Sequence, residues 1–444
     1  MPRFTSPIQK NAELSLEIST WHPKGMGIGY LYSFPILVID AIPGEAGIVR
    51  IVKVTPQHAF GKWIERNRNS PYRIEPSCPV AGRCGGCQLL HVSDAGYEIF
   101  KREIVGNSFQ KYELVIPSLS YFPAPTSREF RNQGRFSTEL TPDGDLKMGL
   151  FGLGNQSVID FGTSCMIQHP LTDLITQKLR EIHLTHPIYP SIQSIVTRVS
   201  FKGDQILVGF SGPALPDSLK AIIIEKLRLI SKVSGIVYWQ TETAAWSVFG
   251  HQEIPVWGNL DICETVGKFS YRYGINSFFQ SNPLQAQQLI ERVLVHLDQN
   301  AQSVLDLYCG VGLFSIPIAA MGKSVLGVES NASAINYARQ NAKANSVQVE
   351  FEAMDAAEFP TGDNRHFDVL VVDPPRTGLS ETVRNRIKQV RFRQIIYVSC
   401  NPETLASDLA DLCQTQYELT GVDIVDMFPG SYHTETVAIL ISRA

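Results

Sequence analysis

No long uninterrupted hydrophobic run occurs in this sequence of 444 residues. A membrane-spanning helix needs about 20 predominantly apolar residues, and the most apolar long stretch, residues 303–322, is broken by Asp306 and three glycines. The first 18 residues also lack the apolar core of a signal peptide. We therefore expect a cytoplasmic protein with no membrane partner.

The sequence also has no internal repeat and no tract rich in Gly and Ser, in Gln and Asn, or in Pro. These absences argue against a repeat architecture and against a long disordered segment. Hydrophobic residues make up 44% of the chain and charged residues 18%, which is typical of a globular protein. The length exceeds that of one ordinary core and predicts two or three domains of roughly 100 to 200 residues each.

Cysteine is scarce: with eight cysteines and no secretion signal, the chain does not indicate a disulfide framework. We expect Cys263 and Cys413 to behave as small buried apolar residues. Three other cysteines stand within ten residues in the stretch "SCPVAGRCGGCQ", and that clustering does not fit the same interpretation.

The clustered residues Cys78, Cys84 and Cys87 follow a C-x5-C-x2-C pattern with glycines between them. Such turn-rich spacing lets three sulfur atoms converge on a metal centre. Tetrahedral zinc and an iron-sulfur cluster both require four ligands, and Cys165, in the polar segment "FGTSCMIQHP", is the best candidate for the fourth. The spacing leaves zinc and iron-sulfur equally open.

The hydrophobic pattern changes twice along the chain. Residues 1–70 alternate in strand fashion between Gly and Pro turns and predict a small β-barrel. Residues 71–270 combine strand and helix patterns, which predicts a mixed α+β domain. In residues 271–444, continuous Val, Ile and Leu runs alternate with helical segments, so we expect a doubly wound, Rossmann-like α/β domain.

Polar residues follow the predicted strands of that last domain, at the edge where such sheets bind ligands. The first strand ends in "DLYCGVG", where two glycines let the backbone approach a ligand, although the complete G-x-G-x-x-G pattern is missing. The second strand ends at Glu329, which is placed to hold the ribose hydroxyls of an adenosine ligand. The fourth strand ends in "VVDPPR", with Asp373 before two prolines.

Cys400 ends the fifth strand and directly precedes a helix opened by "NPET". The positive end of a helix dipole favours a thiolate, so we expect Cys400 to be a nucleophile. Glu435 precedes the last strand and could serve as a base at the same edge.

The ordered set "SFFQSN", "DLYCGVG", "GVES", "VVDPPR", "VSCNPETL" and "HTETVAIL" resembles the bacterial RNA uracil-5-methyltransferases that use S-adenosylmethionine. The segment "GIGYLYSFPILVIDAIPGE" is similar to the OB-like, RNA-binding TRAM domain of many members. The cysteine spacing resembles the 4Fe-4S pattern of the ribosomal RNA branch. The resemblance therefore implies an iron-sulfur cluster and ribosomal RNA as the substrate, with a monomer as the working form.

The resemblance also implies a role for individual residues. The nucleophile falls on Cys400, the base on Glu435, and the aromatic neighbour of the target base on Phe278. The cofactor contacts fall on Gln280, Tyr308, Glu329 and Asp373, and the cluster ligands on Cys78, Cys84, Cys87 and Cys165. Because C5 of uracil is a weak nucleophile, the implied mechanism is addition of Cys400 to C6, methyl transfer to C5, and removal of the C5 proton by Glu435.

RNA binding must be reconciled with a formal net charge of −4. Global charge is a poor guide where basic residues cluster. In "SREFRNQGRF", Arg128, Arg131 and Arg135 alternate with Phe130 and Phe136, which predicts a surface for phosphates and stacked bases, with Arg131 in contact with substrate.

Three alternatives remain at this point. The first is a transfer-RNA uracil-5-methyltransferase or a methyltransferase for another base. The second is an iron-sulfur RNA-binding protein with vestigial catalysis, against which the pair Cys400 and Glu435 argues. The third is a zinc-stabilised RNA-binding module.

Overall fold

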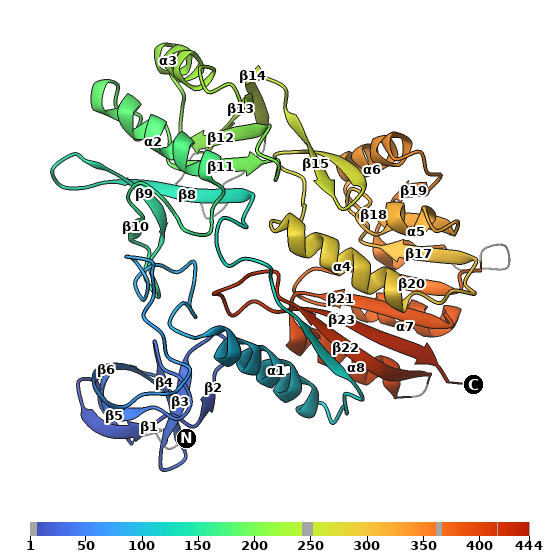
Figure 1. Ribbon diagram of the computed structural model, residues 1–444, viewed down its shortest axis with the longest axis horizontal. Coiled ribbons are helices and arrows are strands. Elements are labelled where there is room, and N and C mark those ends of the chain that lie inside the picture. Colours follow the sequence, from blue (N-terminus) through green and yellow to red (C-terminus); the bar gives the residue numbers. More distant parts are fainter. Residues whose placement is uncertain (1–6, 242–251, 361–365, 415, 444) are drawn as a thin grey trace.

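A computed structural model of the protein describes residues 7–241, 252–360, 366–414 and 416–443. In this part of the chain, three sheets of six, seven and eight strands and one separate hairpin follow one another from the N-terminus to the C-terminus (Figure 1).

The N-terminal sheet has the strand order β1-β5-β6-β4-β3-β2, and only β4 and β6 run parallel. Its strands are β1 (Glu13–Glu17), β2 (Thr20–Trp21), β3 (Gly27–Leu31), β4 (Phe34–Val38), β5 (Ala46–Val54) and β6 (Ala59–Arg68). The sheet curls so that β3 lies against β1: a Cβ added to Gly29 would stand 2.6 Å from the carbonyl oxygen of Glu17. The predicted small β-rich unit is therefore present, and glycine is needed where it closes.

Arg73 fixes the segment that follows this sheet. Its Nη2 donates to Glu45 Oε2 at 2.9 Å and to the carbonyl oxygen of Asp40 at 2.7 Å. Glu45 is completely buried, so the guanidinium is the partner that its carboxylate requires. This contact holds the linker against the N-terminal sheet.

The central sheet has the order β10-β9-β8-β11-β12-β13-β14, and only β12 and β13 run parallel. Its strands are β8 (Gln133–Leu140), β9 (Leu146–Phe151), β10 (Val158–Asp160), β11 (Ser194–Val199), β12 (Ile206–Gly212), β13 (Val233–Gln240) and β14 (Glu253–Gly258). Helices α2 (Pro170–Thr185) and α3 (Asp217–Leu227) bury their apolar sides in one shared core against this sheet. The hairpin of β15 (Asp261–Val266) and β16 (Phe269–Gly274) leads into the C-terminal part.

The C-terminal sheet has the order β19-β18-β17-β20-β21-β23-β22-β7. Its strands are β7 (Leu119–Phe122), β17 (Ser303–Leu307), β18 (Ser324–Glu329), β19 (Glu350–Ala353), β20 (Val369–Val372), β21 (Gln394–Ser399), β22 (Tyr417–Val425) and β23 (Glu435–Ser442). Strands β17 to β21 pair in parallel, whereas β23 is antiparallel to both of its neighbours. The predicted doubly wound α/β fold is confirmed.

Helices cover both faces of this sheet (Figure 1). One face packs against α4 (Pro283–His296), α5 (Ser315–Ala319) and α6 (Ala332–Ala344), and the other against α1 (Asp94–Gln110), α7 (Glu381–Val390) and α8 (Pro402–Cys413). A 3-10 turn, η1 (Ala356–Glu358), follows β19. Burial on both faces explains why these strands are continuous apolar runs.

Two elements that precede the central sheet belong structurally with the C-terminal sheet. Strand β7 extends that sheet by pairing with β22, and α1 lies against its face. The domain limits at residues 70 and 270 stay a prediction. No helix among the described residues is both long enough and apolar enough to cross a membrane.

Candidate active site

A cavity of about 410 Å³ opens where the parallel strands of the C-terminal sheet end. Tyr308 follows β17, Glu329 ends β18, Asp355 lies after β19, and Gly378 lies after β20, and all four line the cavity. Carboxyl ends of parallel strands meet at one edge of a doubly wound sheet, so residues far apart in sequence share this wall. Two of the predicted cofactor contacts, Tyr308 and Glu329, are thus brought together.

The backbone after β17 is unusual at Tyr308, whose φ is 63°. A non-glycine residue in this left-handed region carries strain that proteins concentrate at functional sites. Just before it, Asp306 is completely buried, accepts a hydrogen bond from Ser315, and has an Oδ1 atom with no protein partner. Burial raises the pKa of Asp306 to about 7.

Cys400 and Glu435 lie next to each other across two neighbouring strands. Strands β21 and β23 are antiparallel, and Ser399 pairs with Thr436. Cys400 follows Ser399 and Glu435 precedes Thr436, so these two residues face each other. The thiol therefore lies beside the carboxylate. The two predicted catalytic residues meet at the edge where the cavity opens.

Four charged or ionisable groups form this centre: Cys400, Glu435, Asp373 and Arg376. Burial and the carboxylates of Glu435 and Asp373, opposed by Arg376, together raise the pKa of Cys400 to about 11. Burial, followed by the nearby Asp373, raises the pKa of Glu435, which is only 3% exposed. The side chains around Cys400 therefore favour the thiol and oppose the expected effect of the helix start, and the role of Cys400 as nucleophile stays a prediction.

This electrostatic balance predicts how Cys400 reacts with iodoacetamide. Only the thiolate is alkylated, and a pKa of about 11 leaves the thiol protonated at neutral pH. The alkylation rate of Cys400, followed by peptide mass spectrometry, should therefore rise about tenfold per pH unit from neutral pH to about pH 10. Glu435→Gln removes a neighbouring negative charge and should accelerate alkylation at a fixed pH. A rate that levels off near neutral pH would contradict this prediction.

The "SFFQSN" segment lies beside the loop that precedes Glu435. Phe279 is buried and stacks on a core tyrosine, whereas Phe278 is 73% exposed and available to a ligand. Gln280 is buried at the start of α4, where the Asn282 side chain donates to the Met427 carbonyl at 3.1 Å. This bond connects the segment to the loop between β22 and β23.

Glu329 caps its own turn, because its Oε1 accepts a hydrogen bond from the Asn331 amide at 2.8 Å. We nevertheless expect Glu329→Ala to weaken S-adenosylmethionine binding about tenfold or more, because a charged acceptor in the cavity wall is lost. Calorimetry on the variant measures the affinity for S-adenosylmethionine. The affinity for RNA should stay the same. Glu418→Ala, an exposed carboxylate on β22, is the matched control. Normal cofactor affinity in Glu329→Ala would leave Glu329 with the capping role alone.

The loop that carries the clustered cysteines contacts two distant segments. The Gly85 amide donates to the Phe151 carbonyl at 3.0 Å, and the Leu89 amide donates to the Gly430 carbonyl at 2.9 Å. A Cβ at Gly85 would stand 2.8 Å from the Phe151 oxygen, so glycine is required at this approach. The cysteine loop thereby joins the central sheet to the loop before β23.

The four predicted ligands influence one another. Burial, followed by Cys165, Cys84 and Cys78, raises the pKa of Cys87 to about 12. Burial likewise raises the pKa of Cys165 to about 11. Four neighbouring thiols are a donor set that fits a sulfur-ligated centre. Among the residues that the structure describes, however, no group of three His, Cys, Asp or Glu side chains is close enough to hold a metal ion.

Arg131 lies between these cysteines and the catalytic centre. It lines a cavity of about 280 Å³ together with Cys87, Arg376 and His433. Its guanidinium stands 5.9 Å from the ring of Phe428. Its contact with substrate stays a prediction.

The expectation that Phe130 and Phe136 stack on bases is wrong, because they are 1% and 2% exposed. Phe136 belongs to β8 and points into the core of the central sheet, whereas Phe130 precedes this strand and is buried as well. Only the arginines of that segment remain for RNA.

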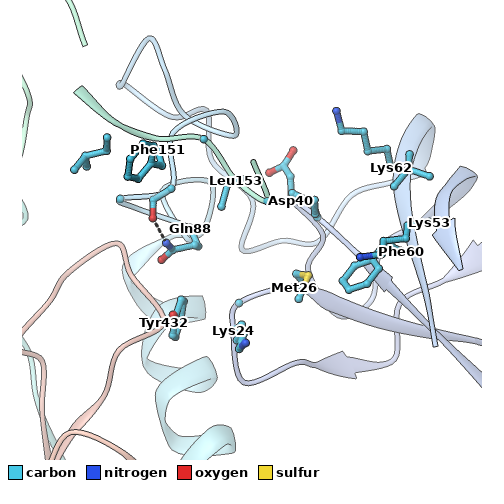
Figure 2. A pocket seen from close by; sticks show the side chains of 18 residues that line it. Lys24, Met26, Asp40, Lys53, Phe60, Lys62, Gln88, Phe151, Leu153 and Tyr432 are labelled. Atoms are coloured by element: carbon cyan, nitrogen blue, oxygen red, sulfur yellow. Dashed lines mark hydrogen bonds between the residues drawn. The ribbon is translucent and has the colours of Figure 1, made fainter. Parts of the chain in front are cut away.

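A larger cavity, about 870 Å³, separates the N-terminal sheet from the cysteine loop. Figure 2 shows Lys53, Phe60 and Lys62 on the N-terminal sheet, with Phe151 and Tyr432 on the opposite side. Neighbouring Tyr432 and His433 have ring centroids 4.3 Å apart and line this cavity and the smaller one, respectively. The two cavities are therefore adjacent, and the second leads to Arg376.

Sequence reasoning missed Arg376 of this centre, Asp355 of the cavity wall and the buried Lys101 of α1. Arg376 occurs in "VVDPPR", but the sequence shows no partner that would indicate its role. Asp355 follows β19, a strand of only four residues that gives a weak signal for a site. Lys101 occurs in a helix, where lysine is ordinarily exposed, and nothing in the pattern signals its burial.

Comparison with known proteins identifies the family. The chain is 30% identical to an uncharacterised RNA methyltransferase of Halalkalibacterium halodurans, over 98% of this chain and 97% of that protein. It is 32% identical to an uncharacterised RNA methyltransferase of Listeria innocua, over 98% and 99% of the two chains. The tRNA (uracil-5-)-methyltransferase family profile matches residues 258–443. The chain belongs to the RNA uracil-5-methyltransferase family.

Among solved structures, this family member resembles the Pyrococcus abyssi tRNA (uracil-54, C5)-methyltransferase in complex with S-adenosyl-L-homocysteine. The TM-score is 0.76 at 26% identity, and the match covers 96% of this chain and 99% of that one. The protein is thus an S-adenosylmethionine-dependent RNA methyltransferase, and the expectation of S-adenosylmethionine as a cofactor is confirmed.

Proposed function

We propose that the protein methylates C5 of a uridine in large-subunit ribosomal RNA, with Cys400 as nucleophile and Glu435 as base. The observation that carries the proposal is the position of Cys400 directly beside Glu435 across β21 and β23, at the same edge of the sheet as the strand-end cavity. A nucleophile and a base are both required to methylate a ring carbon, whereas a protein that only binds RNA uses neither.

The proposed reaction has three steps. After its proton has been lost to solvent, the Cys400 thiolate adds to C6 of the uracil, and the C5–C6 double-bond electrons move to give an enolate. C5 then attacks the methyl group, and S-adenosylhomocysteine leaves. Glu435 finally takes the C5 proton, the C5–C6 double bond forms again, and the bond from C6 to sulfur breaks.

The same side chains lead us to propose that the thiol is activated when S-adenosylmethionine binds. Burial and two carboxylates hold the pKa of Cys400 at about 11. The positive sulfonium of S-adenosylmethionine, bound next to Asp373, would offset that negative charge and favour the thiolate. We propose Gln280, Tyr308, Glu329 and Asp373 as its contacts, and Phe278, which is exposed, as the stacking partner of the extruded uracil.

We propose that a 4Fe-4S cluster is held by Cys78, Cys84, Cys87 and Cys165. Such a cluster would cross-link the cysteine loop to the segment that follows β10. The mutual influence of the four thiols on their ionisation supports this ligand set. Zinc is the competing metal, and colour separates the two: an anaerobically purified iron-sulfur protein is brown, whereas a zinc protein is colourless.

We further propose that the N-terminal sheet is an OB-like TRAM domain and that RNA follows the larger cavity to the smaller one. Lys53 and Lys62 beside Phe60 offer charge for phosphates and a ring for a base.

Lys53→Ala with Lys62→Ala should weaken RNA binding severalfold and reduce the salt dependence of the affinity. Lys226→Ala on α3, outside the cavity, is the control. An unchanged salt dependence in the double variant would remove the larger cavity from the RNA path.

Two RNA classes compete as the substrate. The cysteine pattern supports ribosomal RNA, whereas the likeness to a transfer-RNA enzyme along 96% of this chain supports transfer RNA. Mapping 5-methyluridine in both RNAs from cells with and without the gene decides between them. A site lost only from transfer RNA would replace the ribosomal assignment.

We infer that the enzyme acts as a cytoplasmic monomer, since one chain supplies every residue of the proposed site.

A further inference from the structure

Lys101 is a lysine with no exposed surface, and the proposed reaction does not use it. It lies on α1, outside the segment matched by the family profile. Its Nζ donates to the carbonyl oxygen of His433, stands 3.8 Å from Asp426 Oδ1, and lies 4.7 Å from the ring centroid of Tyr97. A buried ammonium group without a full hydrogen-bonding set is costly, so these contacts define a specific place for this charge.

The contacts of Lys101 lead directly to the proposed base. His433 lies two residues before Glu435, so the bond to its carbonyl fixes the chain where β23 begins. The positive charge of Lys101 also favours the ionised form of Glu435. Lys101 therefore acts on Glu435 in two ways, through the backbone and through the electrostatic field.

The surroundings of both groups contain few other cations. Lys101 is faced by Asp426 at the end of β22, by Glu435 on β23 and by Tyr97 on its own helix, while Tyr121 on β7 is a further neighbour of Asp426. Glu435 is faced by Asp373 and Cys400 from the ends of β20 and β21, and by the exposed Arg376. Arg376 can turn to RNA phosphate, whereas Lys101 is enclosed.

We propose that Lys101 is a positioning residue for Glu435, whose ammonium group keeps the base ionised for removal of the C5 proton. The proposal rests on the function proposed above for Glu435. Burial lowers the pKa of Lys101 to about 8, so its charge is present at neutral pH, when the base must be ionised. Helix α1, which lies far from Glu435 in the sequence, thereby takes part in the chemistry.

The test is a pH profile of the covalent protein–RNA intermediate in single-turnover reactions. In the wild type, the intermediate should persist at pH values where Glu435 is protonated and should disappear at higher pH, where Glu435 is ionised. Loss of a nearby opposite charge raises the pKa of a carboxyl group. The midpoint for persistence should therefore move to higher pH in Lys101→Met, which keeps the length of the side chain. A midpoint equal to that of the wild type would overturn the proposal.

Lys101→Met also leaves Asp426 without its cation, so a second variant is needed. In the double variant Lys101→Met with Asp426→Asn, both charges of that pair are removed, and the raised midpoint should remain. If the midpoint returns to the wild-type value, the effect came from Asp426 and the proposal fails. Thermal unfolding identifies any variant that does not fold, and the double variant decides the question if the single one fails to fold.

Two controls complete the experiment. Lys111→Met removes an exposed lysine of the same helix, which pairs with Glu403, and should leave the midpoint unchanged. Glu435→Gln tests the underlying function: the intermediate should persist at every pH. If Glu435→Gln turns over normally, the proposed base is wrong. If it accumulates the intermediate but Lys101→Met matches the wild type, only the role of Lys101 is wrong.

Discussion

Glu435→Gln is expected to accumulate a covalent protein–RNA adduct that survives denaturing electrophoresis. Cys400 attacks first and Glu435 acts only after methyl transfer, so removal of the base stops the reaction with the bond from C6 to sulfur intact. The amide keeps the size of the side chain but cannot accept the C5 proton. Turnover should fall by about 10² to 10⁴, the usual contribution of a general base. Electrophoresis with labelled RNA that contains the target site measures the adduct.

Cys400→Ala is the matched control, and it should form no adduct and no 5-methyluridine. The double variant should behave like Cys400→Ala, because residues that act in sequence do not have additive effects. RNA with 5-fluorouridine at the target should trap the wild-type enzyme after methylation, since fluorine cannot leave as a proton. Substantial 5-methyluridine formation by Cys400→Ala would rule out covalent catalysis by this residue.

The fold of the C-terminal part could be predicted because its strands are buried on both faces. The runs that form β17, β18, β20 and β21 have no alternation that would suit a one-sided sheet, and a helical segment separates each from the next. The pairing of β7 with β22 could not be predicted. A four-residue strand of half-buried residues carries no signal for a partner that far along the chain.

The catalytic pair illustrates a different limit. Position at a strand end was sufficient to select Cys400, but its ionisation depends on neighbours that only folding brings together. The sequence suggested a helix dipole that favours the thiolate, whereas burial and the carboxylates of Glu435 and Asp373 outweigh it in the folded protein. A dipole at a helix end contributes roughly 0.3 to 1 kcal/mol, which is less than the desolvation of a thiolate.

Burial decided the other misinterpretations as well. Phe130 lies next to Arg131 in the sequence and lines the same cavity beside the cysteines, yet Phe130 is only 1% exposed. Lys101 shows the reverse case, a charged residue at a core position. An amphipathic pattern assigns side chains by polarity, so it fails where a charge is buried for a functional reason.

Cys87→Ser is the second change with a large expected effect. Cys87 is the most enclosed of the clustered cysteines as judged by its pKa, which burial raises to about 12. Its loop is held by contacts to Phe151 and Gly430 rather than by a core of its own. A metal centre stabilises such loops because the free energy of binding is also free energy of folding. The variant should therefore lose iron and soluble yield together, as measured by iron per protein after anaerobic purification.

Cys263→Ser is the control for that experiment. The expectation that Cys263 is buried is wrong: this cysteine is exposed and lies on β15, away from the cluster. It should keep both iron and yield. Full iron content in Cys87→Ser would remove this residue from the ligand set. If the wild type contains zinc rather than iron and Cys87→Ser still loses soluble yield, the four ligands stay assigned and only the metal changes. Either result leaves the pairing of Cys400 with Glu435 intact, because those residues are fixed by the register of β21 and β23.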